Sequence, residues 1–536
     1  MKKETAIKHS MRATPFVLAV FYFFMLFYQA ERVAITDDAR FYMDAAKSYS
    51  AYFENCSPIS KCFEKSHIDR YWRKNNEHPP FAKLLMASGY FVFHRKLGWL
   101  DEIRSLRIGI SVFAAITLLF LFSFTAKAFS FHGAVFASLA FVFLPRTFFH
   151  ARVATLDFAV LGTSFIFIYC YWMGFKSKFW AWMTGVAFGV ALSTKLNAPF
   201  MLLPVLIHYF TVNFKSFNRK NWLKTLFPLQ FTSMLLISLP LFFIMWPWLW
   251  YSTFERFAAY VKFHAFHYGI LMYYLGEVFS EPRPPWHAPW VMMVLTTPLV
   301  TLFFSHISVV LYNWKREVEN CRPMLLVILS AVVSIAVLMF LPAPYYSGVK
   351  LFQPFFPFIC IMAGAGIYET LKRLDFMGKY RFAPAVFFFV PVILSMIDLR
   401  HDHLSYYNEL AGGTKGAAKY GMETQYYDLF YWDLTEFFNR ECENRVCRVS
   451  FEPNPKEYRH TSRILKNSGY LTPNFRFCQS GTCDYHVQTH EYRWRNYPYL
   501  LRDTKELKQV FSLKRQGVEL LTVFKLESGI KGEGGK

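Results

Sequence analysis

The chain has 536 residues, of which 54% are apolar and only 18% are charged, and it contains 61 Phe. This composition is typical of a protein whose main solvent is lipid and argues against a string of soluble domains. In a soluble protein the formal net charge of +22 would suggest nucleic acid binding. In a membrane protein, Lys and Arg instead mark cytoplasmic loops and contact lipid headgroups, so no nucleic acid partner is expected.

Apolar runs of about 17 to 25 residues, the length that crosses a bilayer, predict an all-α polytopic membrane protein with about eleven transmembrane helices. The first run is uniformly apolar and aromatic and no clear cleavage site follows it, so we expect an uncleaved span rather than a signal peptide. The runs lie near residues 14–30, 105–126, 133–149, 155–175, 179–194, 198–212, 226–248, 288–312, 324–341, 351–371 and 383–398.

The distribution of Lys and Arg predicts which loops face the cytoplasm. With the N-terminus inside, the loops near 176–178, 215–224, 315–322 and 372–381 carry many cations, whereas the opposing short loops carry few. Cytoplasmic loops are enriched in Lys and Arg. We therefore expect residues 1–398 to form the membrane domain, with 31–104 and 249–287 as large external loops.

After residue 398 the sequence becomes more polar, and residues 399–536 are expected to form a small α+β external domain. Strands are predicted near 446–451, 484–489 and 519–526, and a helix near 457–468. Six cysteines fall on the expected external side: Cys56 and Cys62 in the first loop, and Cys442, Cys447, Cys478 and Cys483 as two C-x4-C pairs. Four such cysteines suit either zinc or disulfides. An oxidising compartment favours disulfides, whose pairing the spacing leaves open.

Residues 36–83 carry the first candidate chemistry. They begin with Asp37 and Asp38, directly after the first span, and end with the string His78-Pro79-Pro80-Phe81-Ala82-Lys83. Adjacent carboxylates at the membrane boundary, followed by basic residues and a rigid Pro-Pro, suit a site that handles an acidic lipid headgroup. The alternative is structural: the two acids would cap an amphipathic helix over 38–53 and interact with its dipole.

Ionisable residues at the external ends of other spans extend this pattern. Asp157 lies at the external end of the fourth span, a depth at which an ionisable group is a functional candidate. A salt bridge to Arg146 or Arg152 is the structural alternative. Arg107 begins the second span and Lys195 follows the fifth; such cations suit a phosphate, although rim cations also snorkel to water.

The second external loop is rich in aromatic residues and His. Most aromatic residues at this depth belong to the interfacial belt. The density of His and Trp around Glu277 is higher than a belt requires, and His264, His267 and Trp286 lie near it in the sequence. These four residues are candidates for sugar or acceptor contact.

Together these stretches resemble the bacterial members of glycosyltransferase family 39, in the GT-C fold group that includes protein O-mannosyltransferases and the lipid A aminoarabinose transferase. The string from Asp37 to Arg40 is similar to the family's Asp-Glu motif, and His78 to Lys83 resembles its His-Pro-Pro-Leu-Gly-Lys. Arg107 and Asp157 match its basic and acidic positions, and the strings at 246–250, 284–287 and 406–413 look like those of bacterial members of unknown acceptor. Asp38 stands where the family usually has Glu. His78 replaces the Lys of the aminoarabinose branch, which disfavours an aminoarabinose donor.

The resemblance implies an inverting transferase that moves a sugar from a polyprenyl phosphate to an acceptor hydroxyl on the periplasmic face of a bacterial inner membrane. The expected partners are this donor, membrane lipids and an acceptor glycan, lipid or protein. Asp37 would be the general base, with Asp38 beside it and Asp157 orienting the acceptor or tuning Asp37. Cations would stabilise the phosphate leaving group, namely Arg107, Lys83, His78 and Arg40.

No cofactor beyond the lipid-linked donor is expected. A divalent metal held by Asp37, Asp38 and Asp157 is the less favoured alternative. The rival from another class is a polytopic lipid carrier or transporter without transferase activity, in which acidic and basic groups would form a pathway through the membrane. The candidate charges cluster at one rim of the expected spans instead.

Overall fold

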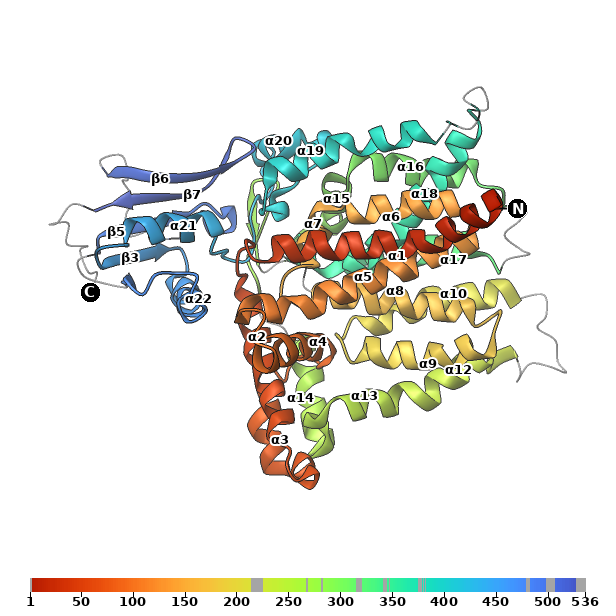
Figure 1. The fold of residues 1–536 in the computed structure, drawn as a ribbon, viewed down its shortest axis with the longest axis horizontal. Coiled ribbons are helices and arrows are strands. Elements are labelled where there is room, and N and C mark those ends of the chain that lie inside the picture. Colours follow the sequence, from red (N-terminus) through yellow and green to blue (C-terminus); the bar gives the residue numbers. More distant parts are fainter. Residues whose placement is uncertain are drawn as a thin grey trace.

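The computed structural model describes residues 2–213, 225–266, 269–280, 283–314, 321–340, 345–346, 348–374, 378, 380, 382–478, 483–497 and 507–526, with side chains from residue 12 onward. The chain is mostly helical, with a sheet near its C-terminal end (Figure 1). The long helices run roughly side by side as a bundle, and the sheet projects from one end of it.

The apolar runs form the bundle. Its helices, including the 3-10 segments η3, η8 and η10 and the π-helical segment η5, are α1 (Lys2–Ala30), α5 (Glu102–Ala128), α6 (Phe131–Val142), α8 (Asp157–Met173), α9 (Lys178–Leu192), η3 (Ala198–Met201), α10 (Leu202–Asn213), α12 (Leu229–Ser233), η5 (Met234–Ser238), α13 (Leu239–Met245), α15 (Ala288–Thr296), α16 (Leu299–Leu311), α17 (Pro323–Phe340), η8 (Lys350–Phe355), α18 (Phe356–Lys372), η10 (Ala383–Phe389) and α19 (Val390–Leu399).

The expected count of eleven spans is not confirmed. Among the described residues, four helices are long and apolar enough to cross a membrane, and a fifth span results if the pair α15 and α16, bent by 108°, counts as one. Shorter apolar helices occupy several of the other expected runs, for example 157–173 and 383–399. The reason is local: kinks and 3-10 turns divide these apolar runs into pieces shorter than a bilayer is thick.

Small residues let the bundle helices approach closely. A Cβ atom at Gly364 would overlap the backbone of Gly133 and Ala137, and one at Gly366 would overlap the carbonyl of Phe304. Close backbone approach at small residues is a common way for helices to pack in a membrane, where hydrophobicity alone does not drive them together.

A layer of shorter elements crosses the end of the bundle that carries the sheet (Figure 1). Thr36 caps the first of them, α2, by accepting a hydrogen bond from the backbone N–H of Ala39, and the apolar face of α2 is buried. Tyr49 of α2 stacks on Trp72 at 4.1 Å between ring centroids. The elements of this layer are α2 (Asp37–Glu54), η1 (Ile59–Phe63), α3 (Lys65–Trp72), α4 (Phe81–Gly89), the π-helix η2 (Tyr90–Lys96), α7 (Pro145–His150), η6 (Pro247–Trp250), α14 (Thr253–Ala265), β1 (Met272–Tyr274) and β2 (Glu277–Phe279).

The C-terminal part is built around a five-stranded sheet of order β4-β3-β5-β7-β6, in which β4, β3 and β5 are parallel and β5, β7 and β6 are antiparallel. Strands lie at all three positions that the sequence predicted, whereas β4 and β6 were not expected. Its elements are η11 (His403–Ser405), η12 (Glu409–Ala411), α20 (Gly413–Lys419), α21 (Trp432–Glu441), β3 (Cys447–Glu452), α22 (Pro455–Asn467), β4 (Phe475–Phe477), β5 (Tyr485–Thr489), η13 (Tyr492–Trp494), β6 (Lys508–Arg515) and β7 (Val518–Lys525).

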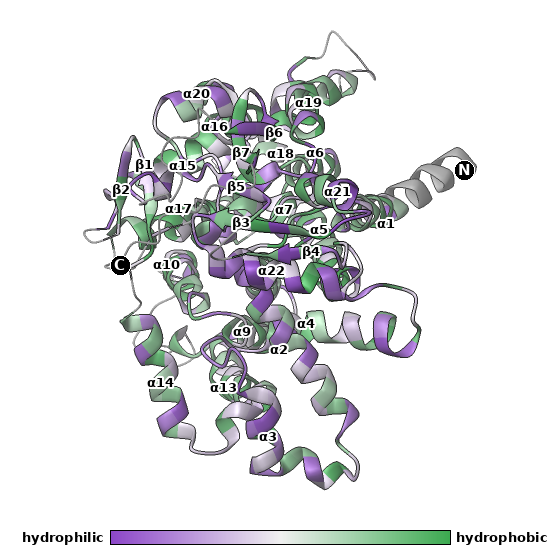
Figure 2. Cartoon of the chain, turned by 90° about the vertical axis from the view of Figure 1, so that its left-hand side faces the viewer, coloured by the Kyte–Doolittle hydropathy of each residue, from purple (hydrophilic) through white to green (hydrophobic). Residues whose placement is uncertain are grey.

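The six cysteines that the sequence analysis singled out pair with their nearest partner in the sequence: Cys56 with Cys62, Cys442 with Cys447 and Cys478 with Cys483. A view from the end that carries the sheet shows that α22 is largely hydrophilic (Figure 2). The sheet region is joined to the start of α2 by a β-bridge between Ile35 and Phe430. The residues that the sequence singled out at 36–38 therefore lie between the bundle and the sheet.

Candidate active site

A cavity of about 380 Å³ opens beside the start of α2. It has a polar end and an apolar wall. The polar lining comes from Asp38, Asn75, Glu77, His78, Lys195, Asn197, His264, Ser334, Tyr346 and Lys350. The apolar lining includes Phe200, Met201, Val333, Val337, Leu338 and Leu351. The three apolar residues from α17 recur at helical spacing, so one face of a candidate span forms part of the wall.

Asp38 and Lys350 form an ion pair at the polar end. Asp38 lies in the first turn of α2, where the helix dipole favours a carboxylate. Lys350 begins η8, and its Nζ lies 5.1 Å from the ring centroid of Tyr427 and 5.7 Å from that of Tyr346. The buried ammonium is thus enclosed by one carboxylate and two aromatic rings.

A second lysine and acid adjoin this pair. Lys195 Nζ lies 3.3 Å from Asp157 Oδ1, and the other oxygen of Asp157 lies 3.6 Å from His150 Nδ1. Asp157 is buried at the first turn of α8. The expected alternative partners, Arg146 and Arg152, instead contact backbone carbonyls and Gln29. The acid predicted from the sequence therefore reaches the cavity through Lys195.

The turn at residues 75–78 also lines the polar end of the cavity. His78 faces Tyr42 and His264, with ring centroids 5.9 and 5.1 Å away. Burial, the largest cause, and nearby Lys195 hold the pKa of His78 well below its ordinary value, so this imidazole is neutral and can offer one donor and one acceptor. Glu77 also lines the cavity and accepts a hydrogen bond of 2.6 Å from Asn75 Nδ2.

Asp37, one residue before Asp38, points to a different set of partners. Its Oδ1 lies 3.0 Å from Arg40 Nε, and Arg40 is also paired with Glu457 of α22. Burial is the main cause that raises the pKa of Asp37 to about 8, followed by its hydrogen bond to Glu457 and the negative charge there. The side chain remains 30% exposed. Asp37 therefore occupies the junction between α2 and the sheet region, next to the end of the cavity that Asp38 lines.

Lys83 does not contact the polar end in the way that a phosphate ligand would. It is fully buried, and its Nζ donates to the carbonyl oxygens of Asn75 at 2.6 Å and His78 at 2.7 Å. Burial lowers the pKa of this amine to about 7. Its position supports a structural role that fixes the turn carrying Glu77 and His78, and gives no support to direct phosphate binding.

Arg107 is likewise engaged by backbone. Its guanidinium donates to the carbonyl oxygens of Ala30, Val33 at 3.0 Å and Ala34 at 3.2 Å. These carbonyls lie at and beyond the end of α1, where helix carbonyls lack partners within the helix. Arg107 therefore fixes the segment that leads into Asp37 and Asp38, and its position does not support the predicted contact with the donor phosphate.

The remaining predicted residues divide between the cavity and other places. His264 lines the cavity, with Nε2 at 2.9 Å from the carbonyl oxygen of Glu77. Glu277 is exposed on β2, and Trp286 is 57% exposed and stacks on Phe340 at 6.1 Å. His267 lies outside the described residues. The structure thus brings His264, but neither Glu277 nor Trp286, to the cavity.

Three site residues were not singled out from the sequence: Lys350, Glu77 and Glu457. Lys350 appeared only as a lone cation in a short loop, although it directly precedes an apolar run. Glu77 adjoins the His-Pro-Pro string. Glu457 sits in a highly polar helix, where a carboxylate is usually solvated. Within the described part of the chain, no group of three or more His, Cys, Asp or Glu side chains could hold a metal ion.

No family model and no curated protein matches the chain. Among solved structures, the chain is similar to ArnT from Cupriavidus metallidurans bound to undecaprenyl phosphate, with 14% identity, a TM-score of 0.49 and coverage of 95% of this chain and 97% of that one. The apo form of ArnT gives 13% identity, a TM-score of 0.47 and coverage of 97% and 98%. The chain is also similar to archaeal oligosaccharyltransferase AglB from Archaeoglobus fulgidus, in complex with an inhibitory peptide and a dolichol-phosphate. The identity is 11%, the TM-score is 0.47, and the match covers 95% of this chain and 74% of that one.

At such identities and TM-scores, the likeness by itself assigns no activity to this chain.

Proposed function

We propose that the protein is a membrane glycosyltransferase that moves a sugar from a polyprenyl phosphate to an acceptor hydroxyl. One observation carries the proposal: the cavity combines an apolar wall with a polar end that holds two lysines, carboxylates and neutral imidazole. A polyprenyl-phosphate sugar has the same division into an apolar tail and an anionic, hydroxyl-rich head. The motif resemblance to glycosyltransferase family 39 supports the same class.

Lys195 and Lys350 are the proposed contacts of the donor phosphate. Both line the cavity, and both are held in place by a carboxylate, Asp157 and Asp38 respectively. When the bond between the anomeric carbon and the phosphate oxygen breaks, negative charge grows on that oxygen. Ammonium groups already positioned there stabilise the transition state without reorganising. This assignment replaces Arg107 and Lys83 by two other cations of the same rim.

Asp37 remains the proposed general base. Its partly exposed carboxylate lies at the junction with the sheet region, whereas Asp38 lies on the donor cavity. Neighbouring Cα atoms are about 3.8 Å apart, so an acceptor that reaches Asp37 lies close to a sugar held beside Asp38. Asp37 would take the hydroxyl proton while the acceptor oxygen attacks the anomeric carbon from the face opposite the phosphate, with inversion. Polyprenyl phosphate then leaves.

The proposed site faces outward. The cation-rich loops predict a cytoplasmic N-terminus, which puts α2, the polar end of the cavity and the C-terminal region, residues 399–536, on the periplasmic side of a bacterial inner membrane. No nucleotide is needed, because the lipid phosphate is the leaving group. A glycan, a lipid and a secreted protein remain the acceptor classes to be tested.

The deciding experiment is release of polyprenyl phosphate by the reconstituted protein from a panel of polyprenyl-phosphate sugars, with membrane extracts as the acceptor source. The wild type is compared with Asp37→Asn, Asp38→Asn and, as a matched control, Glu443→Gln, whose exposed side chain lies outside the site. Consumption of one donor by the wild type and the control, with loss of turnover in Asp37→Asn, supports the proposal. Equal behaviour of wild type and both aspartate variants with every donor overturns it. Movement of labelled lipid across vesicles without sugar transfer would establish the carrier instead.

A further inference from the structure

Glu457 belongs to the C-terminal region but meets the proposed base. It lies in the first turn of α22, which packs on the sheet through Tyr458, stacked on Phe451 at 4.7 Å. The Glu457 carboxylate is paired with Arg40 of α2, and Arg40 lies 3.0 Å from Asp37. The side chain of Glu457 is only 18% exposed. A carboxylate of a separate layer is therefore brought to the start of α2.

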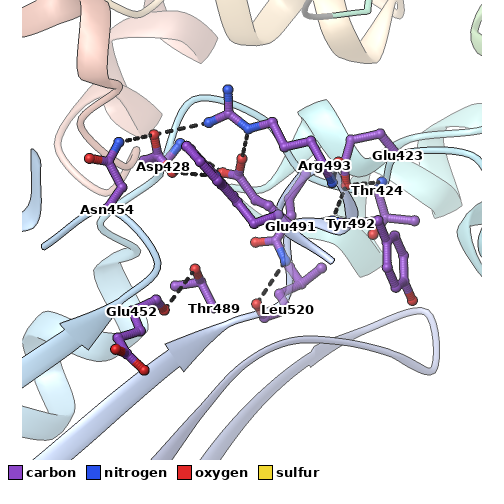
Figure 3. A network of polar contacts seen from close by, with 12 residues as sticks. Glu423, Thr424, Asp428, Glu452, Asn454, Thr489, Glu491, Tyr492, Arg493 and Leu520 are labelled. Carbon is purple, nitrogen blue, oxygen red and sulfur yellow. Dashed lines mark hydrogen bonds and ion pairs between the residues drawn. The ribbon is translucent and has the colours of Figure 1, made fainter. Parts of the chain in front are cut away.

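A buried network of polar contacts fixes where α22 begins (Figure 3). Arg493 contacts Asp428 at 2.9 Å and Glu491 at 2.6 Å. The other face of this network holds Asn454, whose Nδ2 donates to Asp428 Oδ2 at 2.8 Å. Asn454 has a positive φ of 63° and directly precedes the first residue of α22. Asn is one of the residues that tolerate this left-handed conformation. Because the network holds Asn454 in it, the network sets the direction of α22 and the position of Glu457 in its first turn.

The same network holds the backbone against which Asp37 is placed. The N–H of Asp428 donates to Glu491 Oε1 at 2.7 Å. The preceding residue, Tyr427, accepts a hydrogen bond of 3.1 Å from the backbone N–H of Asp37, and its ring faces Lys350. One buried cluster thus positions both the main chain and the carboxylate that contact Asp37.

We propose, on the basis of the function proposed above, that Glu457 is a positioning residue through which the C-terminal region orients Asp37 and controls its proton. The site is then complete only when α22 is docked on α2. Glu457 acts through Asp37 and Arg40 and does not itself touch the donor.

The charges around Asp37 determine the expected effect. Its pKa of about 8 results first from burial, then from the hydrogen bond and negative charge of Glu457 and from Asp38, opposed by Arg40. On the α22 side, His460 lies within the electrostatic influence of Arg40, Asp44 and Glu457. Replacing Glu457 by Gln removes one negative charge but keeps a hydrogen-bonding side chain of the same shape. The Asp37 carboxyl should then lose its proton at lower pH.

The test is the pH profile of kcat/KM for donor turnover in the wild type, Glu457→Gln and the control Glu443→Gln. In the wild type the activity should rise with increasing pH along a limb centred near pH 8, as expected for a base that must lose its proton. In Glu457→Gln this limb should move toward acid by about one pH unit, while Glu443→Gln keeps the wild-type profile. An unchanged limb in Glu457→Gln, or an equal loss of activity at every pH, overturns the proposal.

A second measurement does not depend on turnover and uses the infrared absorption of protonated carboxyl groups in the reconstituted protein as a function of pH. Glu491 and Glu423 also have raised pKa values, about 8 and about 7, mainly because of burial, so the Asp37 component is isolated as the difference between wild type and Asp37→Asn. That component should titrate at lower pH in Glu457→Gln and near the wild-type pH in Glu457→Asp. An identical component in Glu457→Gln overturns the coupling. If the Asp37 component shifts as expected in Glu457→Gln but the wild type consumes no donor, the proposed function is overturned and the coupling between Glu457 and Asp37 still holds.

Discussion

Lys350 and Asp38 are 312 positions apart in the sequence and form an ion pair at the polar end of the cavity. The pair joins the start of α2 to η8, which together with α18 forms the candidate span Lys350–Lys372. Lys350 is buried and lies near the rings of Tyr346 and Tyr427, whereas the side chain of Asp38 is 29% exposed. An ion pair that takes a lysine out of water is weak evidence for stability. Its position on the cavity points to a role in binding.

Substitution of either cavity lysine should weaken donor binding. Lys195→Ala and Lys350→Ala each remove one charged donor, and a charged hydrogen bond contributes about 1.5–3 kcal/mol, which corresponds to a rise of roughly ten-fold or more in the donor KM. The exposed Lys419 provides the matched control, since Lys419→Ala removes a charge far from the cavity lining. Steady-state kinetics with varied donor separates KM from kcat.

The Lys350 variant has a side effect that must be distinguished. When the ammonium of Lys350 is removed, the Asp38 carboxylate loses its ion-pair partner. Loss of fold is therefore a competing cause of inactivity. The double variant Lys350→Met with Asp38→Asn removes both charges. If it unfolds at the wild-type temperature and still has a raised donor KM, binding is the cause. A wild-type KM in all these variants contradicts the assignment of the phosphate site.

Lys83→Met should act on stability before it acts on chemistry. The substitution leaves the carbonyl oxygens of Asn75 and His78 without their donor, and each buried acceptor left unsatisfied costs about 1–3 kcal/mol. We expect a lower unfolding temperature in detergent, together with disorder of the turn that carries His78. Thermal unfolding monitored with and without donor checks this. A variant of wild-type stability that has lost donor affinity would instead restore Lys83 as a phosphate ligand.

The sequence predicted the chemistry of the rim better than the partner of each cation. Asp157 was singled out from its residue type and depth, and His78 from the His-Pro-Pro string and the resemblance that it carries; His78 lines the polar end and Asp157 contacts it through Lys195. Arg107 and Lys83 were expected to bind phosphate at the same rim, yet both donate to backbone carbonyls. Residue type shows that a cation lies at the rim. It does not show whether a helix end or an open cavity lies in front of it, because that depends on how the following segment turns.

Glu457 shows a second limit of sequence reasoning. Its helix has a polar composition that predicts a solvated surface, and the distance in sequence to Asp37 is 420 residues by their numbers, 457 minus 37. Only the docking of α22 on α2 reveals the contact with Arg40. The strands of the sheet were predictable where β-branched and aromatic residues dominate, whereas β6, with Lys at both ends of its core segment, resembles an exposed edge.

Arg107→Ala should loosen the entry into α2. Three carbonyl oxygens at and beyond the end of α1 lose their donor, so we expect destabilisation of about 2 kcal/mol or more and reduced turnover, because the segment that leads into Asp37 loses its hydrogen bonds. The conservative Arg107→Lys should recover part of the stability, since one ammonium cannot serve all three carbonyls in the fixed fork geometry of Arg. Unfolding temperature and donor kinetics are measured in the same preparations. A raised donor KM at wild-type stability contradicts this role.

The buried acids of the C-terminal region should make stability fall as pH rises. The unfolded Glu491 side chain releases its proton near 4.5, whereas burial holds the proton in the folded protein up to about pH 8. Between these values the folded state binds more protons than the unfolded state, so the free energy of unfolding decreases with increasing pH. The test is thermal unfolding at about pH 6 and about pH 9, one below and one above the folded-state pKa of Glu491. The unfolding temperature should be lower at the higher pH. Glu491→Gln, which keeps a neutral side chain at every pH, should reduce this difference, whereas the exposed-site variant Glu443→Gln should retain it. A wild type that is equally stable at both pH values contradicts the prediction.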